Sequence, residues 1–148
     1  MAEIKNVVVV GAGTMGSQIA LQTAFSTRYQ VRLVDSSESQ LERARAQNQK
    51  LVARAVERGR KTESEGADAL GRIATTSDLE AAVTDADLVV EAVFEDLDTK
   101  RDIFKRVDAA APSRVTPPPR LLTVATSVAL NARGLDGTLA STTQPSCA

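Results

Sequence analysis

Three glycines near the N-terminus have the spacing of a phosphate-binding turn. Gly11, Gly13 and Gly16 form a G-x-G-x-x-G pattern directly after the apolar run Val7–Val10. In such a turn the first glycine permits a tight bend, the second lets the main chain approach a pyrophosphate, and the third lets a helix pack closely on a strand. A helix that begins there adds free N–H groups and the positive end of its dipole. The pattern therefore predicts a site for the diphosphate of a dinucleotide.

An acidic residue stands where such a site needs one. Asp35 follows the last glycine by about 20 residues, the usual separation in dinucleotide-binding units, and ends the apolar run Gln30–Val34. A carboxylate there accepts hydrogen bonds from the adenosine ribose, and its charge repels a 2′-phosphate, so NAD is favoured over NADP. Two alternatives stay open: a glycine-rich turn without a ligand, and an acid that merely flanks a helix.

The elements that would position these residues alternate along the chain. Strands are expected at Asn6–Val10, Gln30–Val34, Ile73–Thr75 and Leu88–Val93. Helices are expected at Thr14–Phe25, from Ser37 to Gly59, from Thr62 towards Leu70, for a turn or two after Ser77, and at Leu97–Ala111. Capping pairs mark three of the helix starts, namely Ser37 with Gln40, Thr62 with Glu65 and Ser77 with Glu80. This alternation predicts an α/β protein, a Rossmann-type parallel sheet with helices on both faces.

Composition excludes several classes of function. The 148 residues are 43% hydrophobic and 25% charged, with a net charge of −1, so nothing favours nucleic acid or a membrane as partner. The single cysteine, Cys147, cannot form an intrachain disulfide, which permits a reducing compartment, and we expect a cytoplasmic location without a bound metal. The chain contains no histidine, which excludes a histidine base for this polypeptide acting alone.

The character of the sequence changes after Ala111. All five prolines lie beyond that point, and the charged residues there are Arg114, Arg120, Arg133 and Asp136. We therefore divide the chain into a dinucleotide-binding domain, residues 1–111, and a poorly ordered Pro/Ser/Thr-rich tail, residues 112–148. One further strand is expected within the tail, at 121–124.

Two separated segments resemble the NAD-dependent 3-hydroxyacyl-CoA dehydrogenases, including the 3-hydroxybutyryl-CoA type. The first runs from Ile4 through the glycines to Gly16 and continues at Leu33-Val34-Asp35; the second is Ala86–Leu97, followed by Lys100 and Phe104. The resemblance covers residues 1–111 approximately. In that family this region is the cofactor domain, and a separate helical domain completes the substrate site and dimerises.

The resemblance implies which residues contact NAD. Asp35 would bind the adenine ribose, and Glu95 and Lys100 would add further contacts; alternatively, this last pair forms a salt-bridged helix start. Met15 is expected to pack in the protein rather than take part in chemistry. The expected cofactor-binding residues are Gly11, Ala12, Gly13, Thr14, Met15, Gly16, Asp35, Glu95 and Lys100.

The family's substrate is an acyl-CoA, oxidised from 3-hydroxyacyl-CoA to 3-oxoacyl-CoA or reduced in reverse, in fatty-acid or butanoate metabolism. Lys50, Arg54 and Arg58 recur every four residues and share a helical face. Such a stripe either holds the phosphates of CoA or is the solvated face of an amphipathic helix, and the second interpretation is favoured.

The family pattern breaks after Ala111. The family's catalytic histidine, paired with a glutamate, has no counterpart; Ala125 stands where an asparagine is expected, and Ser127 is a weak candidate for the substrate-contacting serine. We expect an out-of-frame or otherwise truncated continuation of a longer dehydrogenase, inactive alone. The alternatives are a non-catalytic NAD-binding module, the cofactor half of a two-chain enzyme, or a domain of another dehydrogenase family.

Overall fold

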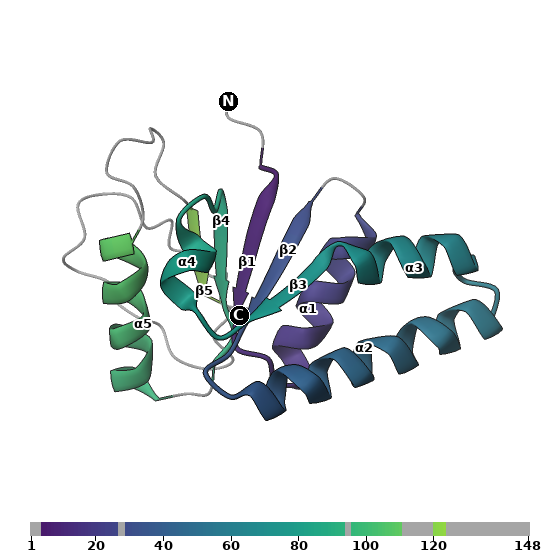
Figure 1. The fold of residues 1–148 in the computed structure, drawn as a ribbon, viewed down its shortest axis with the longest axis horizontal. Helices are drawn as coiled ribbons and strands as arrows, with labels where there is room; N and C mark the ends of the chain where they lie inside the picture. Colours follow the sequence, from purple (N-terminus) through teal and green to yellow (C-terminus); the bar gives the residue numbers. More distant parts are fainter. Residues whose placement is uncertain (1–3, 27–28, 94–95, 111–119, 124–148) are drawn as a thin grey trace, which may run out of the picture.

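A five-stranded parallel sheet forms the centre of the protein (Figure 1). The computed structural model describes residues 4–26, 29–93, 96–110 and 120–123. In chain order the strands are β1 Asn6–Val10, β2 Gln30–Val34, β3 Ile73–Thr76, β4 Leu88–Glu91 and β5 Arg120–Thr123. Their spatial order is β3-β2-β1-β4-β5, with every neighbouring pair parallel. The α/β class with a Rossmann-type sheet, predicted from the alternation, is confirmed.

Helices cover both faces of this sheet (Figure 1). They are α1 Thr14–Phe25, α2 Glu38–Glu57, α3 Glu63–Gly71, α4 Leu79–Val83 and α5 Leu97–Ala110. The first three pack on one face, and α4 and α5 pack on the other. The four consecutive valines of β1 suit this arrangement, because a strand covered on both faces is apolar at every position. No helix in the described ranges combines the length and the apolar character needed to cross a membrane.

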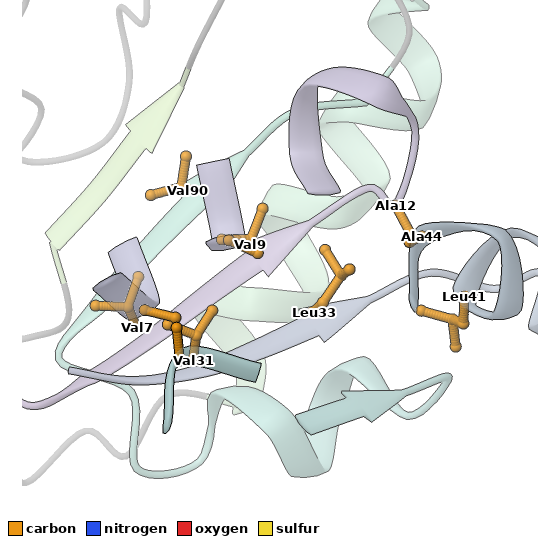
Figure 2. Packing of buried hydrophobic residues seen from close by; sticks show 11 residues of the cluster. Val7, Val9, Ala12, Val31, Leu33, Leu41, Ala44 and Val90 are labelled. Carbon is orange, nitrogen blue, oxygen red and sulfur yellow. The ribbon is translucent and has the colours of Figure 1, made fainter. Parts of the chain in front are cut away.

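Each valine of β1 contributes to one of two cores. Val7 and Val9 pack with Leu33 of β2 under the α1–α3 face, and Figure 2 shows this cluster together with Leu41 of α2. The alternate positions, such as Val8, pack under α4 and α5. Because β4 pairs with β1, the register between them decides which of the two cores each β4 side chain enters.

The sheet contains a reversal of chain order between β1 and β4. The chain passes from β1 outward through β2 to β3, and β4 then pairs with the other side of β1. Val10 lies opposite Val34 on one side and Glu91 on the other. The carboxyl ends of these three strands consequently meet at one edge, where ligands of open parallel sheets bind.

Two of the three predicted helix starts are confirmed and the third is wrong. The Ser37 hydroxyl accepts a hydrogen bond from the Gln40 N–H at 3.4 Å, and Thr62 forms a reciprocal capping box with Glu65. The start of α4 is capped by Asp78 instead of Ser77. Asp78 lies one residue after Ser77, and its carboxylate accepts the Ala81 N–H at 2.9 Å. A cap at Ser77 would leave this N–H group without that acceptor.

Strand ends also differ from expectation by small shifts. β4 ends at Glu91 rather than Val93 because the Glu91 carboxylate accepts the Val93 N–H at 2.7 Å, so that group does not pair with another strand. β5 begins at Arg120, one residue before the range 121–124 that the sequence suggested, and belongs to the same sheet. The division of the chain at Ala111 stays a prediction.

Candidate cofactor-binding site

The turn after β1 admits only glycine at its first position. Gly11 has a φ of +106°, and its N–H donates to the Val34 carbonyl at 2.7 Å. A Cβ atom added there would lie 2.7 Å from the Ala92 carbonyl oxygen, which follows β4. Both the backbone conformation and the close approach of the β4 segment therefore exclude a side chain.

The other two glycines of the pattern differ from each other. A Cβ on Gly16 would lie 1.7 Å from the Gly11 carbonyl oxygen, so Gly16 allows α1 to pack against the turn. A Cβ on Gly13 would meet nothing within 4 Å, and Gly13 is exposed. The protein's own packing thus explains two glycines, whereas the third faces open space, as expected where a ligand approaches the main chain.

The N-terminus of α1 lacks a side-chain cap. Gly13 is its N-cap and makes no side-chain hydrogen bond, whereas α2, α3 and α4 begin with Ser37, Thr62 and Asp78, each of which caps its helix. The first N–H groups of a helix have no partner within the helix. Those of α1 are therefore free to bind an anion, which the helix dipole also favours.

Met15 lies on the outer side of this first turn. Its side chain is 42% exposed, so the expectation that Met15 packs in the protein is wrong. The reason is the orientation of α1, whose buried side at this end consists of Gly16 and Ser17. Met15 is instead exposed, as Gly13 and Thr14 are.

Asp35 lies at the end of β2 and is joined to the turn. Its Oδ2 accepts the Ala12 N–H at 2.9 Å, and its Oδ1 accepts the Ser37 N–H at 2.9 Å. Each carboxylate oxygen can accept a second hydrogen bond, so contact with a ribose remains sterically and chemically possible for this half-buried group. The sequence indicated the ribose contact but gave no sign of the bond to Ala12.

Lys100, in the first turn of α5, is buried against β4. It is 4% exposed, and its Nζ lies 3.7 Å from Oε2 of Glu91, which is fully buried. Glu91 is not among the residues predicted to bind the cofactor, although a lone carboxylate at the end of an apolar strand is a usable signal. Glu95, the expected neighbour of Lys100, lies outside the described residues, and so does Ser127.

A basic groove lies between α1 and the C-terminal half of α2. Its volume is about 340 Å³. It is lined by Arg54, Arg58, Arg60 and Lys61 together with Gln18, Leu21, Gln22, Phe25, Leu51 and Ala55. The Lys61 ammonium also lies 4.8 Å from the centre of the Phe25 ring. Two members of the predicted basic stripe thus line a concave surface, while Lys50 is not among the lining residues.

The resolved pKa shifts belong mainly to exposed pairs away from the sheet edge. Hydrogen bonding to Arg32 lowers the pKa of Asp85, and hydrogen bonding to Arg106 lowers the pKa of Glu80. Within the described ranges no group of three acidic, cysteine or histidine residues could hold a metal ion. The chemistry available at the sheet edge is therefore that of main-chain N–H groups, the Asp35 carboxylate and the Lys100–Glu91 pair.

Comparison with known proteins agrees with this geometry. Residues 6–132 match the family model of the 3-hydroxyacyl-CoA dehydrogenase NAD-binding domain. A probable 3-hydroxybutyryl-CoA dehydrogenase of Bacillus subtilis is 38% identical over 125 residues, which are 84% of this chain and 41% of that protein. The fatty acid oxidation complex subunit alpha of Shewanella loihica is 38% identical over 71% of this chain and 15% of its own length.

A solved structure shows the same arrangement. The 3-hydroxybutyryl-CoA dehydrogenase of Escherichia coli superimposes with a TM-score of 0.77 at 33% identity, over 86% of this chain and 26% of that one. The chain thus spans less than half the length of these relatives. With the family match covering most of its residues, the chain belongs to the 3-hydroxyacyl-CoA dehydrogenase NAD-binding domain family.

Proposed function

We propose that the chain binds NAD along the carboxyl edge of β1, β2 and β4, as the cofactor-binding part of an enzyme that oxidises 3-hydroxyacyl-CoA to 3-oxoacyl-CoA. The observation that carries this proposal is the contrast within the glycine turn. Gly11 and Gly16 are required by internal packing, whereas Gly13 is exposed, opens into free space and caps a helix without a side chain. An uncapped helix start beside a bare main chain fits the diphosphate of a dinucleotide.

Each part of the cofactor has a partner at this edge. The main chain from Gly11 to Gly16 would hold the diphosphate, and Asp35 would accept hydrogen bonds from the adenosine ribose. Lys100 would face the remaining half, because it lies on α5 beside β4, on the opposite side of β1 from Asp35. Bound NAD supplies the hydride acceptor, while these residues bind and orient the dinucleotide.

The basic groove supports an acyl-CoA as the second ligand. Arg54, Arg58 and two further cations line a concave surface without an acidic residue in its described lining. CoA carries several phosphate groups, which such a surface attracts. Arg54→Gln with Arg58→Gln is expected to weaken CoA binding measured by calorimetry, whereas Lys50→Gln, on the same helix but outside the groove lining, leaves it unchanged. Equal effects of the two changes would show general charge attraction only.

A second candidate is a non-catalytic NAD-binding module, or the cofactor half of an enzyme with two chains. The observation in its favour is the absence of histidine from these 148 residues, while the family's reaction uses a histidine base. Both candidates require the same NAD site and differ in turnover. A cytoplasmic location remains a prediction.

Titration with NADH tests the site, with two glycine variants as a matched pair. Gly13→Ala and Gly71→Ala both place a methyl group in open space, at positions without a positive φ. Gly71→Ala is expected to leave unfolding stability unchanged or raise it by about 0.4 to 1 kcal/mol. Gly13→Ala is expected to cost about 1 kcal/mol or less, because Gly13 is the N-cap of α1 and alanine is a poorer cap than glycine. Only Gly13→Ala should weaken NADH binding, by about tenfold or more, because its methyl group meets the diphosphate. NADH binding that Gly13→Ala leaves intact would contradict the proposed site.

A further inference from the structure

The fully buried carboxylate of Glu91 has two oxygens with different surroundings. Oε1 accepts the Val93 N–H at 2.7 Å. Oε2 is buried without a hydrogen-bond partner among the described residues, and its nearest cation is the Lys100 Nζ at 3.7 Å. Lys100 is itself almost fully buried. The two charges are therefore held close together, but at a distance longer than a hydrogen bond.

A buried ion pair contributes little net free energy to the attachment of a helix to a sheet. Removing both charges from water costs several kcal/mol per ion, and the attraction between them repays that cost only when the geometry and the hydrogen bonding are good. Here one carboxylate oxygen has no hydrogen bond. Apolar contacts already hold α5 on this face, through Ile103 and Val107. The attachment of α5 to the sheet therefore does not fully explain why a buried ion pair is present here.

The Glu91–Lys100 pair lies at the edge of the sheet where a ligand is expected to bind. Glu91 is the last residue of β4, opposite Val10 in the register, and the following residue, Ala92, touches the glycine turn at Gly11. Chain order reverses between β1 and β4, and the crevice at such a reversal is where open parallel sheets bind ligands. Glu91 shares the strand face of Val89, which packs towards α4 and α5, so Lys100 reaches it from α5.

We infer that Glu91 is a positioning residue, which holds the Lys100 ammonium at the edge of the β1–β4 crevice on the side of the nicotinamide half of NAD. The inference rests on the proposed NAD site. With Asp35 on β2 assigned to the adenosine half, the other half of the dinucleotide extends towards β4, where this pair lies. An ammonium carries three N–H donors, so it can remain paired with Glu91 and still donate to a ligand.

Glu91→Gln tests this role, because it removes the charge and keeps the shape of the side chain and an oxygen that can accept the Val93 N–H. The full chain is titrated with NADH and with ADP, which has the same adenosine and diphosphate but lacks the whole nicotinamide half, its ribose included. We expect Glu91→Gln to weaken NADH binding by about tenfold, the loss typical of one charge-assisted hydrogen bond. ADP binding should change by about twofold or less, because ADP lacks the half of the cofactor that Lys100 faces.

Two further variants separate positioning from attachment. Lys100→Met should weaken NADH binding as Glu91→Gln does, and the double variant should be no weaker than Lys100→Met, because Glu91 acts through Lys100. Glu80→Gln is the matched control: it removes an exposed carboxylate of α4 that pairs with Arg106, which lies on α5 as Lys100 does. It should leave both ligands unaffected. The double variant also removes both buried charges, so it remains informative if Glu91→Gln alone does not fold.

The outcomes distinguish the inference from the proposed site. If Glu91→Gln weakens NADH and ADP equally, or changes neither, the pair only attaches α5 and the inference is overturned. The same holds if the double variant keeps the unaltered ratio of NADH to ADP affinity. If the unaltered, folded chain binds neither ligand, the proposed NAD site itself fails.

Discussion

Asp35 connects the glycine turn to the start of α2 through one carboxylate. It accepts the Ala12 N–H inside the turn and the Ser37 N–H just before the helix. The same group is proposed to accept hydrogen bonds from the adenosine ribose. Asp35 therefore shapes the turn that would hold the diphosphate, in addition to any direct contact that it makes with the cofactor.

Asp35→Ala should consequently affect both stability and ligand binding. Two main-chain N–H groups lose an ionised acceptor, so we expect a loss of about 1 to 3 kcal/mol in the free energy of unfolding. NADH affinity should fall by about tenfold or more, because the ribose contact disappears and the turn loosens. Denaturant unfolding and NADH titration measure the two effects.

Asp78→Ala provides the comparison for this variant. Asp78 also accepts one main-chain N–H, that of Ala81, but this hydrogen bond caps α4 and does not involve the glycine turn. Its removal should cost about 1 kcal/mol of stability and leave NADH affinity unchanged. If Asp35→Ala resembles Asp78→Ala in both measurements, Asp35 has only a structural role.

At the scale of single residues, the sequence reveals those whose role is local. The glycine turn and Asp35 could be predicted because their spacing alone encodes a strand, a turn and a helix start. Lys100 was also predicted to contact NAD, but its pairing with Glu91 could not be predicted, because it depends on how α5 packs against β4, which no local pattern encodes. Met15 was misjudged for a related reason: its burial depends on which side of α1 faces the sheet.

The packing of α2 against α3 depends on a helical glycine. A Cβ on Gly66 would lie 2.4 Å from Cγ1 of Val52, so the two helices approach closely at this point. We expect Gly66→Ala to destabilise the protein by about 1 to 3 kcal/mol through overpacking, despite the higher helix propensity of alanine.

The overpacking can be relieved from the other helix. Val52→Ala removes the clashing methyl group, so the double variant should be more stable than the sum of the two single effects indicates. Urea unfolding measures the coupling. Gly71→Ala, in the same helix with open space around its added methyl group, should not destabilise the protein. Additive effects of Gly66→Ala and Val52→Ala would show that the helices separate instead of clashing.

An exposed ion pair joins β2 to the segment before β4. The Arg32 Nη2 donates to Asp85 Oδ2 at 3.0 Å, and this hydrogen bond lowers the pKa of Asp85 below its ordinary value of 3.8. A lowered pKa means that the pair's contribution is complete above the unfolded-state pKa and is lost as the pH falls through the folded-state pKa. Because the Arg32 side chain is partly exposed and that of Asp85 is largely exposed, the contribution is about 1 kcal/mol or less.

The effect of Asp85→Asn on the stability of the protein should therefore depend on pH. At neutral pH the variant is expected to be slightly less stable than the unaltered chain, and the difference should disappear in acid, below the pKa of Asp85, where Asp85 is protonated in both states. Thermal unfolding across this pH range measures the difference. A stability difference that stays constant into acid would exclude the ion pair as its source.

Element types were predictable because hydrophobic period and capping residues are local signals. The capping box at Thr62 is confirmed as the sequence suggested. The prediction that Ser77 caps α4 was wrong because Asp78, the next residue, is an equally good cap. Only the position at which the helix begins decides between the two. Asn48 of α2 is buried with Ala44 and Val52, which lie four residues before and after it on the same helix face. Its polarity alone predicts an exposed position.

Over the whole molecule, alternation of strands and helices predicts the parallel sheet but not its strand order. The reversal between β1 and β4 places Asp35, after β2, and Lys100, beside β4, on opposite sides of β1 and its glycine turn. These residues are distant in sequence, and only the complete sheet places them along one edge. The match to longer dehydrogenases leaves the reaction of the whole protein as a proposal.

The pure 148-residue chain is expected to bind NADH without reducing acetoacetyl-CoA. The reaction needs a group that exchanges a proton with the substrate oxygen, and such general acid–base catalysis contributes about 10²- to 10⁴-fold to the rate. The chain contains no histidine for this task. Loss of NADH absorbance in the presence of acetoacetyl-CoA measures turnover, and Gly13→Ala identifies its source. Activity that persists in this variant belongs to a contaminant, whereas activity that Gly13→Ala abolishes belongs to the chain. The second result would contradict the prediction and require a different proton donor within these residues.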